Sequence, residues 1–362
     1  MQTHPPLITS SDCEGAGEVF SIATPAVIPD NSKKSEGPGS DDELFFRGTK
    51  YLTVSSQLHL EALAQSVGNV WALSPTFRAE KSETPRHLSE FYMLEAETAF
   101  VDDLDVVMDL VETLLRTIAQ TLTDSQVGKE LLAARAATID STEPTAVQQE
   151  ITRDELEARW NGLIESPWPR ITYAEAILTL QRAVSDGQAF VYPPTSGASL
   201  QAEHEKYLAN HIGKGRPVFV TDYPRDVKAF YMSPSKTPQE TQDQIPTVAC
   251  FDLVVPEICE IVGGSLREHR LAHLLESMQR HGLLKDGESE AVAQGATPDI
   301  SNNVYSKMVP SNLQWYTDLR KFGSVPHGGF GLGFDRLLCY LSGVPNIREV
   351  VTFPRWHGRC DC

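Results

Sequence analysis

The sequence lacks any run of about 18 consecutive apolar residues, which excludes a membrane-spanning helix. The first 20 residues contain no lysine or arginine, so we expect no secretory signal or basic transit peptide in this chain. Basic residues are outnumbered throughout: 31 Lys and Arg stand against 49 Asp and Glu, a formal charge of −18. This balance excludes a surface coated in basic residues for non-specific nucleic-acid binding, but leaves room for a polyanion in a local basic cleft.

Cysteine is also scarce, with six scattered residues that lie mostly in apolar sequence. This pattern favours reduced, partly buried thiols over a disulfide framework. The terminal Cys360-Asp361-Cys362 resembles half of a metal clip, but no second cysteine or histidine pair accompanies it, so we expect no metal there. The G-x-G-x-x-G of dinucleotide-binding folds and the Lys-Ser/Thr of a P-loop are both missing, and no serine or cysteine triad is evident.

Apolar periodicity predicts an α+β fold in which an antiparallel sheet is flanked by helices. Strands are expected on both sides of segment 76–91, directly before Gly331, and at 217–220, 228–232, 247–255 and 257–264. Helices are expected at 55–67, 102–122, 171–184, 199–211 and 266–282. The regular alternation of strands and helices that a doubly wound parallel fold requires is missing.

Three polar segments interrupt this pattern. Residues 29–43 are rich in glycine, serine and charge and are predicted to form a mobile surface loop. Residues 123–167 are polar and helical in tendency, with weak core content, and we interpret them as an insertion. Residues 285–304 are interpreted as a polar linker.

The segment 76–91, TFRAEKSETPRHLSEF, places a charged hairpin between two apolar strands. Arg78 and Arg86 lie on its opposite arms, so their planar guanidinium groups can converge on one phosphate or carboxylate ligand. Phe91 begins the returning strand and offers a flat face to a base. Taken alone, the segment favours a solvated hairpin with surface ion pairs over a binding site.

The segment ACFDLVVPEICEIVGGSLREHR places Asp252 and Glu260 in apolar, strand-like sequence. Buried carboxylates need a cation or hydrogen-bond donors, and carboxylate oxygens together with phosphates are what Mg²⁺ prefers. Arg267 follows the Gly263-Gly264 bend and can point back at the same site. An ordinary ion pair is the alternative explanation.

The segment GGFGLGFDR predicts a glycine-rich turn between a strand and a helix, where Gly331 and Gly333 allow close approach of the backbone to a ligand. Arg336 directly after the turn adds another permanent cation. Three arginine-bearing segments and two buried carboxylates suit ATP with Mg²⁺. They are typical of acid activation by adenylation, in which positioning and charge stabilisation dominate catalysis.

These segments resemble a known family. FRAEKSETPRHLSEF is similar to motif 2 of the class II aminoacyl-tRNA synthetases, and GGFGLGFDRLL is similar to motif 3. ITSSDCEGAGEVF and EIVGGSLREHR occur in the family's order, so the resemblance covers almost all of 1–362 and points to the catalytic domain of the aspartyl, asparaginyl and lysyl subclass. It implies an antiparallel sheet surrounded by helices, activation of an amino acid with ATP, and its transfer to the terminal ribose of tRNA.

The resemblance also implies roles for the charged hairpin. Arg78 would bind the α-phosphate and the carboxylate of the amino acid, and Glu80 would contact the adenine side or the acceptor end. Arg86 and His87 would hold the distal phosphates. Phe91 would stack on adenine.

The remaining nucleotide-binding roles fall on the two later segments. Asp252 and Glu260 would carry Mg²⁺. Arg336 would face adenine and the γ-phosphate, with Gly333 beside the nucleotide.

The resemblance places five positions around the amino acid. Glu14 and Gln57 match positions that hold the substrate ammonium group. Aspartyl enzymes carry a lysine where this chain has Leu60, and an aspartate where it has Glu95. Because an amide side chain needs both an acceptor and a donor, Glu95 and Arg267 favour asparagine, with tRNA(Asn) as partner, over aspartate.

Family members normally carry an N-terminal anticodon-binding OB-fold and a long motif 1 helix that builds a homodimer. The sequence begins near the end of motif 1, so we expect the anticodon-binding domain to be absent from it and dimerisation to be affected. The closing FPRWHGRCDC resembles the fungal mitochondrial type, which favours the mitochondrial matrix over the cytoplasm. Two alternatives remain: a free-standing paralogue that makes aminoacyl-adenylates, as in asparagine synthesis, and a non-catalytic binding or regulatory paralogue.

Overall fold

The computed structural model describes residues 1–13, 18–22, 45–46, 48–137, 151–236, 245–284 and 309–361. The predicted loop at 29–43, the linker at 285–304 and the candidate residue Glu14 lie outside the described residues, so these predictions stay as they are.

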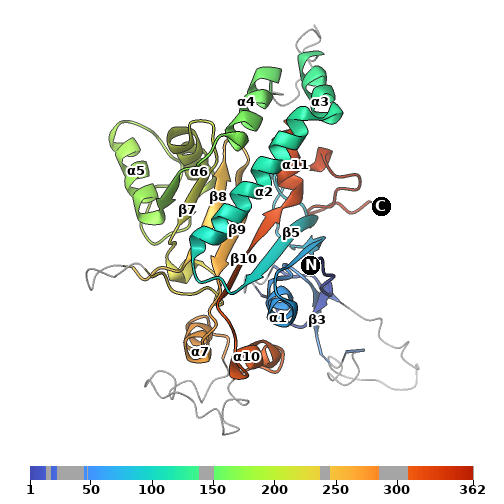
Figure 1. Cartoon of the computed structure of the whole chain (residues 1–362), viewed down its shortest axis with the longest axis vertical. Helices are drawn as coiled ribbons and strands as arrows, with labels where there is room; N and C mark the ends of the chain where they lie inside the picture. The colour runs from blue at the N-terminus through green and yellow to red at the C-terminus, as the bar shows by residue number, and fades with distance from the viewer. Residues whose placement is uncertain are drawn as a thin grey trace.

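The described residues form a seven-stranded sheet in the order β4-β5-β10-β9-β8-β7-β6 (Figure 1). Neighbouring strands run antiparallel except β6 and β7, which run parallel. This confirms the predicted antiparallel sheet. The strands are Val70–Phe77 (β4), Glu90–Ala99 (β5), Arg170–Thr172 (β6), Val218–Thr221 (β7), Cys250–Val255 (β8), Cys259–Leu266 (β9) and His327–Gly333 (β10). A second, small sheet joins Ile8–Thr9 (β1), Lys50–Leu52 (β3) and Ser21–Ile22 (β2).

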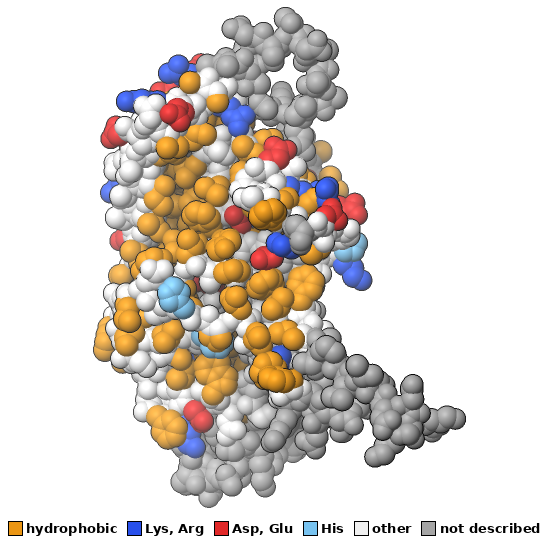
Figure 2. Space-filling view, turned by 90° about the vertical axis from the view of Figure 1, so that its right-hand side faces the viewer, with side chains coloured by type: hydrophobic (Ala, Val, Ile, Leu, Met, Phe, Trp, Pro, Cys, Tyr) orange, Lys and Arg blue, Asp and Glu red, His pale blue; other side chains and the backbone are white. Residues whose placement is uncertain are grey.

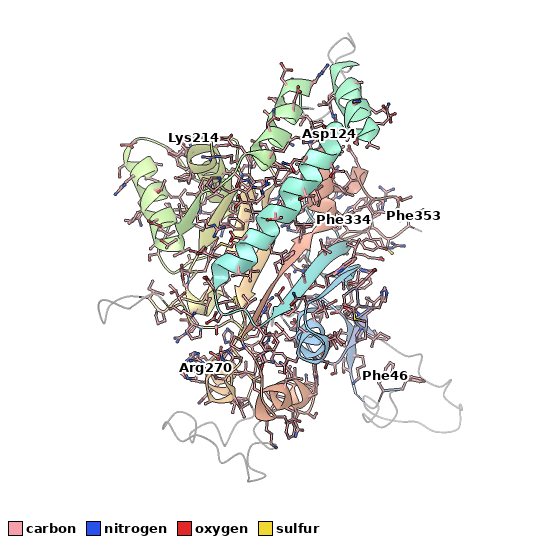
Figure 3. The ribbon with its side chains drawn as sticks, viewed as in Figure 1. Phe46, Asp124, Lys214, Arg270, Phe334 and Phe353 are labelled. Atoms are coloured by element: carbon pink, nitrogen blue, oxygen red, sulfur yellow. The ribbon has the colours of Figure 1, made fainter. Side chains whose placement is uncertain are left out.

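Helices cover the sheet and extend beyond it (Figure 1). Two labelled residues in Figure 3, Asp124 at the end of α2 and Arg270 before α7, lie at opposite ends of the molecule. The helices are Gln57–Val67 (α1), Leu104–Asp124 (α2), Gln126–Ala137 (α3), Arg153–Ile164 (α4), Tyr173–Ser185 (α5), Ala202–Leu208 (α6), Leu271–Arg280 (α7), Gln314–Lys321 (α10) and Phe334–Ser342 (α11). No helix in the described part of the chain is long and apolar enough to cross a membrane.

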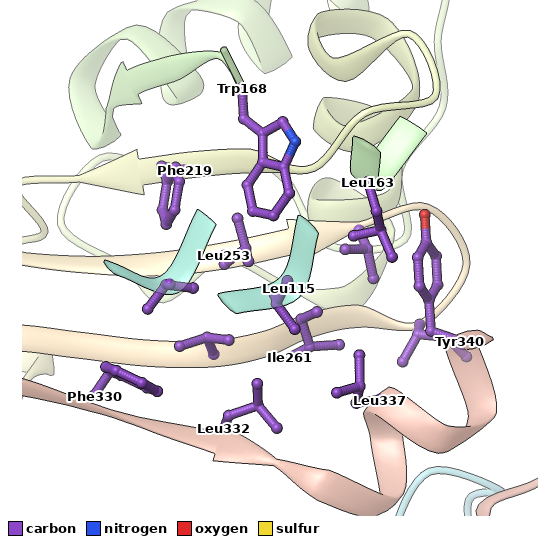
Figure 4. Close-up of a cluster of buried hydrophobic side chains, with 14 of the residues drawn as sticks. Leu115, Leu163, Trp168, Phe219, Leu253, Ile261, Phe330, Leu332, Leu337 and Tyr340 are labelled. Carbon is purple, nitrogen blue, oxygen red and sulfur yellow. The ribbon is translucent and has the colours of Figure 1, made fainter. Parts of the chain in front are cut away.

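The main core lies between the sheet and the helices α2, α4 and α11 (Figure 4). Leu115 of α2 and Leu163 of α4 are fully buried there against strand residues such as Phe219 and Leu253. This packing fixes β8, β9 and β10 from one face and leaves the opposite face of the sheet to carry the charged side chains described below.

Most of the predicted elements are confirmed, including α5, whose capping box joins Thr172 and Glu175. The turn predicted at Gly331 and Gly333 and the bend predicted at Gly263-Gly264 are wrong, because these glycines lie within β10 and β9, where Gly331 pairs with Gly263. The strand predicted at 228–232 is wrong: apart from an isolated bridge at Met232, the segment is irregular, because Phe230 and Tyr231 pack against α7 and α10 rather than in a sheet. The helix predicted at 266–282 begins only at Leu271, since Leu266 still belongs to β9.

The segment 123–167 contains the end of α2, then α3 and α4. The weak core content expected for it is wrong for α4, because Leu156, Trp160 and Leu163 are fully buried, and the Trp160 Nε1 donates to the Leu341 carbonyl at 2.9 Å. Whether this segment is an insertion stays a prediction.

Candidate functional site

Two adjoining cavities lie over β5, β10 and β9 in the described part of the chain. They measure about 470 Å³ and about 280 Å³, and we refer to them as the larger and the smaller cavity. Arg78, Met93, Glu260 and Gly331 line both. The two cavities therefore meet at a boundary that carries one guanidinium and one carboxylate.

Alternate side chains of β5 form the floor of the cavities. Phe91, Met93, Glu95 and Glu97 are spaced two apart and point to one face of the sheet. Opposite Glu95, β10 contributes Gly331, where an added Cβ would come within 2.6 Å of the Met93 Cε. The absence of a side chain at this position keeps the space above the sheet open.

The charged hairpin folds back over the smaller cavity. The Arg78 amide donates to the Ser89 carbonyl at 3.0 Å, which extends the β4–β5 pairing into the hairpin. The Arg78 guanidinium lies 5.5 Å from the centre of the Phe91 ring, and Glu80 lies 3.1 Å from the His87 Nε2. Burial lowers the pKa of His87, and the nearby arginines reinforce this effect against Glu80.

Arg86 and Arg336 complete the wall of the smaller cavity. The Arg86 Nη1 donates to the Cys259 Sγ at 2.7 Å, and the Arg336 Nη1 donates to the Glu260 carbonyl at 3.0 Å. Together with Arg78, these two guanidinium groups give the smaller cavity the character of an anion site. The convergence predicted for the arginines is thus present in the geometry, and a merely solvated hairpin does not account for it.

The two carboxylates predicted to bind Mg²⁺ both face Gly263. A Cβ built there would lie 3.1 Å from the Glu260 Oε1 and 3.6 Å from the Asp252 Oδ1. Asp252 is also bound by Lys228, whose Nζ lies 2.7 Å from both carboxylate oxygens. Burial raises the pKa of Asp252, and the ammonium of Lys228 opposes this shift. Lys228 was not among the site residues predicted from the sequence.

A third carboxylate, Glu205 of α6, lies close to this pair. Its Oε2 accepts a hydrogen bond from the Glu260 amide at 3.2 Å. Burial, followed by the negative charges of Glu260 and Asp252, raises the pKa of Glu205 to about 7. A cation bound to Asp252 and Glu260 would offset the negative charge that these carboxylates bring near Glu205.

Glu95 lines the larger cavity. This carboxylate is 2% exposed and accepts hydrogen bonds from the Ser55 hydroxyl and the Ser56 amide. Burial raises the pKa of Glu95, and these donors oppose the shift. The donors fix the carboxylate in one orientation toward the cavity.

Arg267 and Gln57 also line the larger cavity. Arg267 is not directed at Asp252 and Glu260 as one reading of the sequence proposed. Its Nη2 lies 3.1 Å from the Glu97 Oε2 and 2.6 Å from the Gln57 Oε1, because Glu97 comes from the same face of β5. The Gln57 amide nitrogen in turn donates to Glu97 at 2.9 Å.

A family model described as tRNA synthetases class II (D, K and N) matches residues 1–357. The chain belongs to this family. The sheet and the site agree with the fold and the motif order that the sequence predicted.

Curated relatives narrow the comparison. The chain is 43% identical over 354 residues to the mitochondrial asparagine–tRNA ligase of Saccharomyces cerevisiae, covering 97% of this chain and 62% of the relative. It is 40% identical over 358 residues to the asparagine–tRNA ligase of Clostridium tetani, covering 99% of this chain and 66% of that protein. The chain therefore spans a little under two thirds of the length of these relatives.

Solved structures give the same picture. The asparaginyl-tRNA synthetase of Pyrococcus horikoshii, complexed with asparaginyl-adenylate, superposes with a TM-score of 0.71 at 30% identity, covering 99% of this chain and 64% of that one. The Entamoeba histolytica asparaginyl-tRNA synthetase in complex with asparaginyl-adenylate has a TM-score of 0.67 at 28% identity, covering 100% and 63%.

The structure brings together every predicted site residue that it describes. Leu60, which the specificity argument used, is fully buried in a small cluster with Ala64, Val70 and Ala72 and does not line the larger cavity. Met93 and Glu97 were not predicted from the sequence, although period-two spacing from Phe91 and Glu95 places them on the same face of the strand.

Proposed function

We propose that the chain activates asparagine with ATP and transfers the asparaginyl group to the 3′-terminal ribose of tRNA(Asn). The observation that carries this proposal is the junction of the two cavities, where Arg78 joins the smaller, cationic cavity to the larger one, which Glu95 lines. A nucleoside triphosphate in the smaller cavity and a small polar amino acid in the larger one would then meet at Arg78. The names of the relatives, and the adenylate held by two structural neighbours, support this reading.

The cationic compartment suits ATP. Arg78 would bind the α-phosphate and the carboxylate of asparagine, so that one guanidinium aligns the attacking oxygen with phosphorus. Arg86, His87 and Arg336 would hold the distal phosphates, stabilising the charge that leaves with pyrophosphate. Phe91 would stack on adenine. Gly333, which has no side chain, would let the nucleotide approach the protein backbone closely.

Asp252 and Glu260 fit Mg²⁺, because both carboxylates face the same open point above Gly263. Two carboxylates suffice, since Mg²⁺ completes its coordination with phosphate oxygens and water. When bound, the ion would neutralise part of the negative charge of the phosphates. Lys228, which shares Asp252, would keep that carboxylate ionised and in place before the ion arrives.

Specificity for asparagine would come from Glu95 and Arg267. Glu95 offers a fixed acceptor to the amide nitrogen, and Arg267 offers a donor to the amide oxygen. Aspartate would bring a second negative charge against Glu95. Lys228 adds a cation to this cavity, but its ammonium is bound to Asp252 and would compensate aspartate poorly. Gln57, with Glu14, would hold the substrate ammonium group.

Glu95→Gln is expected to lower kcat/KM for asparagine in ATP–pyrophosphate exchange by about 100-fold, because the amide nitrogen loses a charged, preorganised acceptor. The preference for asparagine over aspartate should shrink as well, since the repulsive charge is gone. The matched control is Glu90→Gln on the other face of β5, where Glu90 pairs with Arg355 at 3.0 Å. If the control loses as much activity as Glu95→Gln, the specificity role is wrong.

The test of the whole proposal is amino-acid-dependent ATP–pyrophosphate exchange with asparagine, aspartate and lysine compared side by side. Exchange with asparagine supports the proposal. Exchange with aspartate alone points to the adenylate-forming paralogue instead. No exchange with any amino acid, from a protein shown to be folded, favours a non-catalytic paralogue.

Dimerisation is part of the proposal. β4 lies at the edge of the described sheet and exposes Trp71 and Leu73, each to 39%. Figure 2 views the molecule from this side and shows hydrophobic side chains gathered over the face. An exposed apolar face of this kind supports a homodimer, which sedimentation equilibrium would detect as a concentration-dependent doubling of mass.

The mitochondrial matrix is the compartment we propose, supported by the similarity to the yeast mitochondrial relative, with the cytoplasm as the alternative. Fractionation of cells with an antibody against this chain would separate the two compartments.

A further inference from the structure

Two residues where the β8–β9 turn enters β9 adopt a backbone conformation that favours glycine. Glu257 has a φ of 66° and Cys259 a φ of 69°. A residue with a Cβ is strained in this left-handed region. Such strain persists where surrounding contacts enforce it, and it gathers at functional sites. The turn lies directly before Glu260, which lines both cavities.

The Cys259 side chain connects two parts of the site. Its Sγ accepts the hydrogen bond from the Arg86 Nη1 at 2.7 Å and donates to the Ala202 carbonyl at 3.4 Å. The residue is 1% exposed, so both contacts of the thiol are shielded from solvent. One thiol thus links the hairpin, through Arg86, to the start of α6, through Ala202.

Arg86 needs such support, because it lies in the irregular tip of the hairpin rather than in a strand. A long, rotatable side chain loses conformational entropy when it closes on a ligand, and holding it beforehand removes part of that cost. Sulfur is a weak hydrogen-bond acceptor, so phosphate oxygens can displace it without a large penalty. The contact would hold the guanidinium ready without competing strongly for it.

We propose that Cys259 is a positioning residue for nucleotide binding: its thiol holds Arg86 at the wall of the smaller cavity, ready to receive the distal phosphates of ATP. This rests on the proposed function, which supplies ATP as the anion. Cys259 does not touch the reacting atoms and acts through Arg86 alone. The strained backbone at residue 259 is the cost of placing a thiol where glycine would fit better.

The proposal predicts opposite effects of Cys259→Gly on stability and on binding. Glycine relieves the left-handed strain, so the Tm should rise by about 1–3 °C. At the same time Arg86 loses its support, and the Kd for ATP measured by titration calorimetry should rise by about three- to tenfold. A residue with a purely structural role would not move the two quantities in opposite directions.

Three further variants make the test specific. Glu257→Gly relieves the same kind of strain two residues away but removes only an exposed ion pair with Lys206, so it should leave the Kd for ATP unchanged. Cys259→Ser keeps a donor and an acceptor and should restore the Kd to within about twofold of the starting protein. In an Arg86→Ala background, Cys259→Gly should no longer weaken ATP binding.

The outcomes separate this inference from the proposed function. Unchanged or tighter ATP binding by Cys259→Gly overturns the positioning role, as does an undiminished effect of Cys259→Gly when Arg86 is absent. A protein that binds ATP but shows no exchange with asparagine overturns the proposed function and leaves the role of Cys259 measurable. Failure of the starting protein to bind ATP overturns both.

Discussion

Replacing Arg78 by alanine is expected to lower the rate of asparagine-dependent ATP–pyrophosphate exchange by about 10²–10³-fold. Arg78 lines both cavities and so lies where the carboxylate of the amino acid and the α-phosphate must meet. Its loss would remove a positive charge whose attraction to the phosphate is stronger in a partly enclosed site than in water. It would also remove the group that aligns the two reactants. Both effects act on the chemical step, so kcat should fall.

Arg336→Ala should give a loss of similar size, since Arg336 lines the cavity proposed for the nucleotide. Arg182→Ala in α5 is the matched control: Arg182 is exposed and lies outside both cavities, so exchange should stay near the level of the starting protein. Circular dichroism must show that each variant is folded. Exchange by Arg78→Ala within threefold of the starting rate would refute the central role of this residue.

Glu61→Gln is expected to destabilise the protein by about 3–5 kcal/mol, the usual cost of removing one partner from a buried ion pair. The side chains of Glu61 and Arg320 are completely buried and form an ion pair. The Glu61 carboxylate also accepts from the Tyr316 hydroxyl at 2.9 Å and lies 3.1 Å from the His327 Nε2. Urea unfolding measures the change, and a loss below 1 kcal/mol would contradict the prediction.

The stabilisation by Glu61 should also depend on pH. Burial alone would raise the pKa of Glu61, but Arg320 and His327 outweigh burial and leave it below its ordinary value of 4.5. This contribution is complete above pH 4.5 and is lost as the pH falls further. The pKa of His327 is raised above 6.5, because Glu61 outweighs the effect of burial, so its contribution is complete below pH 6.5 and is lost at higher pH.

The difference in unfolding free energy between the starting protein and Glu61→Gln should therefore be largest between about pH 4.5 and 6.5 and decline on either side. Glu276→Gln provides the control, because Glu276 pairs with Arg280 on the surface of α7, where such pairs contribute about 0.3–0.5 kcal/mol. A pH-independent difference for Glu61→Gln would show that the network does not titrate as described.

The residues that sequence reasoning found share a simple physical basis. Phe91 and Glu95 are four apart in a strand, so period-two alternation alone predicts that they face the same side, with Met93 between them. Asp252 and Glu260 are conspicuous as acids within apolar runs. Each signal is local, and the resemblance to motifs 2 and 3 then combines them into one site.

The site residues that could not be predicted from the sequence are brought to the site by contacts between distant parts of the chain. Lys228 lies in an apolar stretch that was predicted to be a strand, and its role appears only when that stretch crosses the cavity beside Asp252. Glu205 looks like an ordinary surface acid of a helix until α6 docks against the start of β9. No local pattern encodes either approach.

The position of β10 has a consequence for the order in which the protein forms. β5 and β9 do not pair with each other in this sheet; β10 lies between them, although it follows β5 by more than 200 residues in the sequence. During synthesis, Glu95 of β5 and Arg267, directly after β9, are brought together only when β10 emerges and bridges the gap between these two strands. Such late, long-range closure slows folding and leaves two strand edges unpaired in the nascent chain. Truncation before residue 327 should thus abolish the site as a unit, however many of its side chains the remaining chain retains.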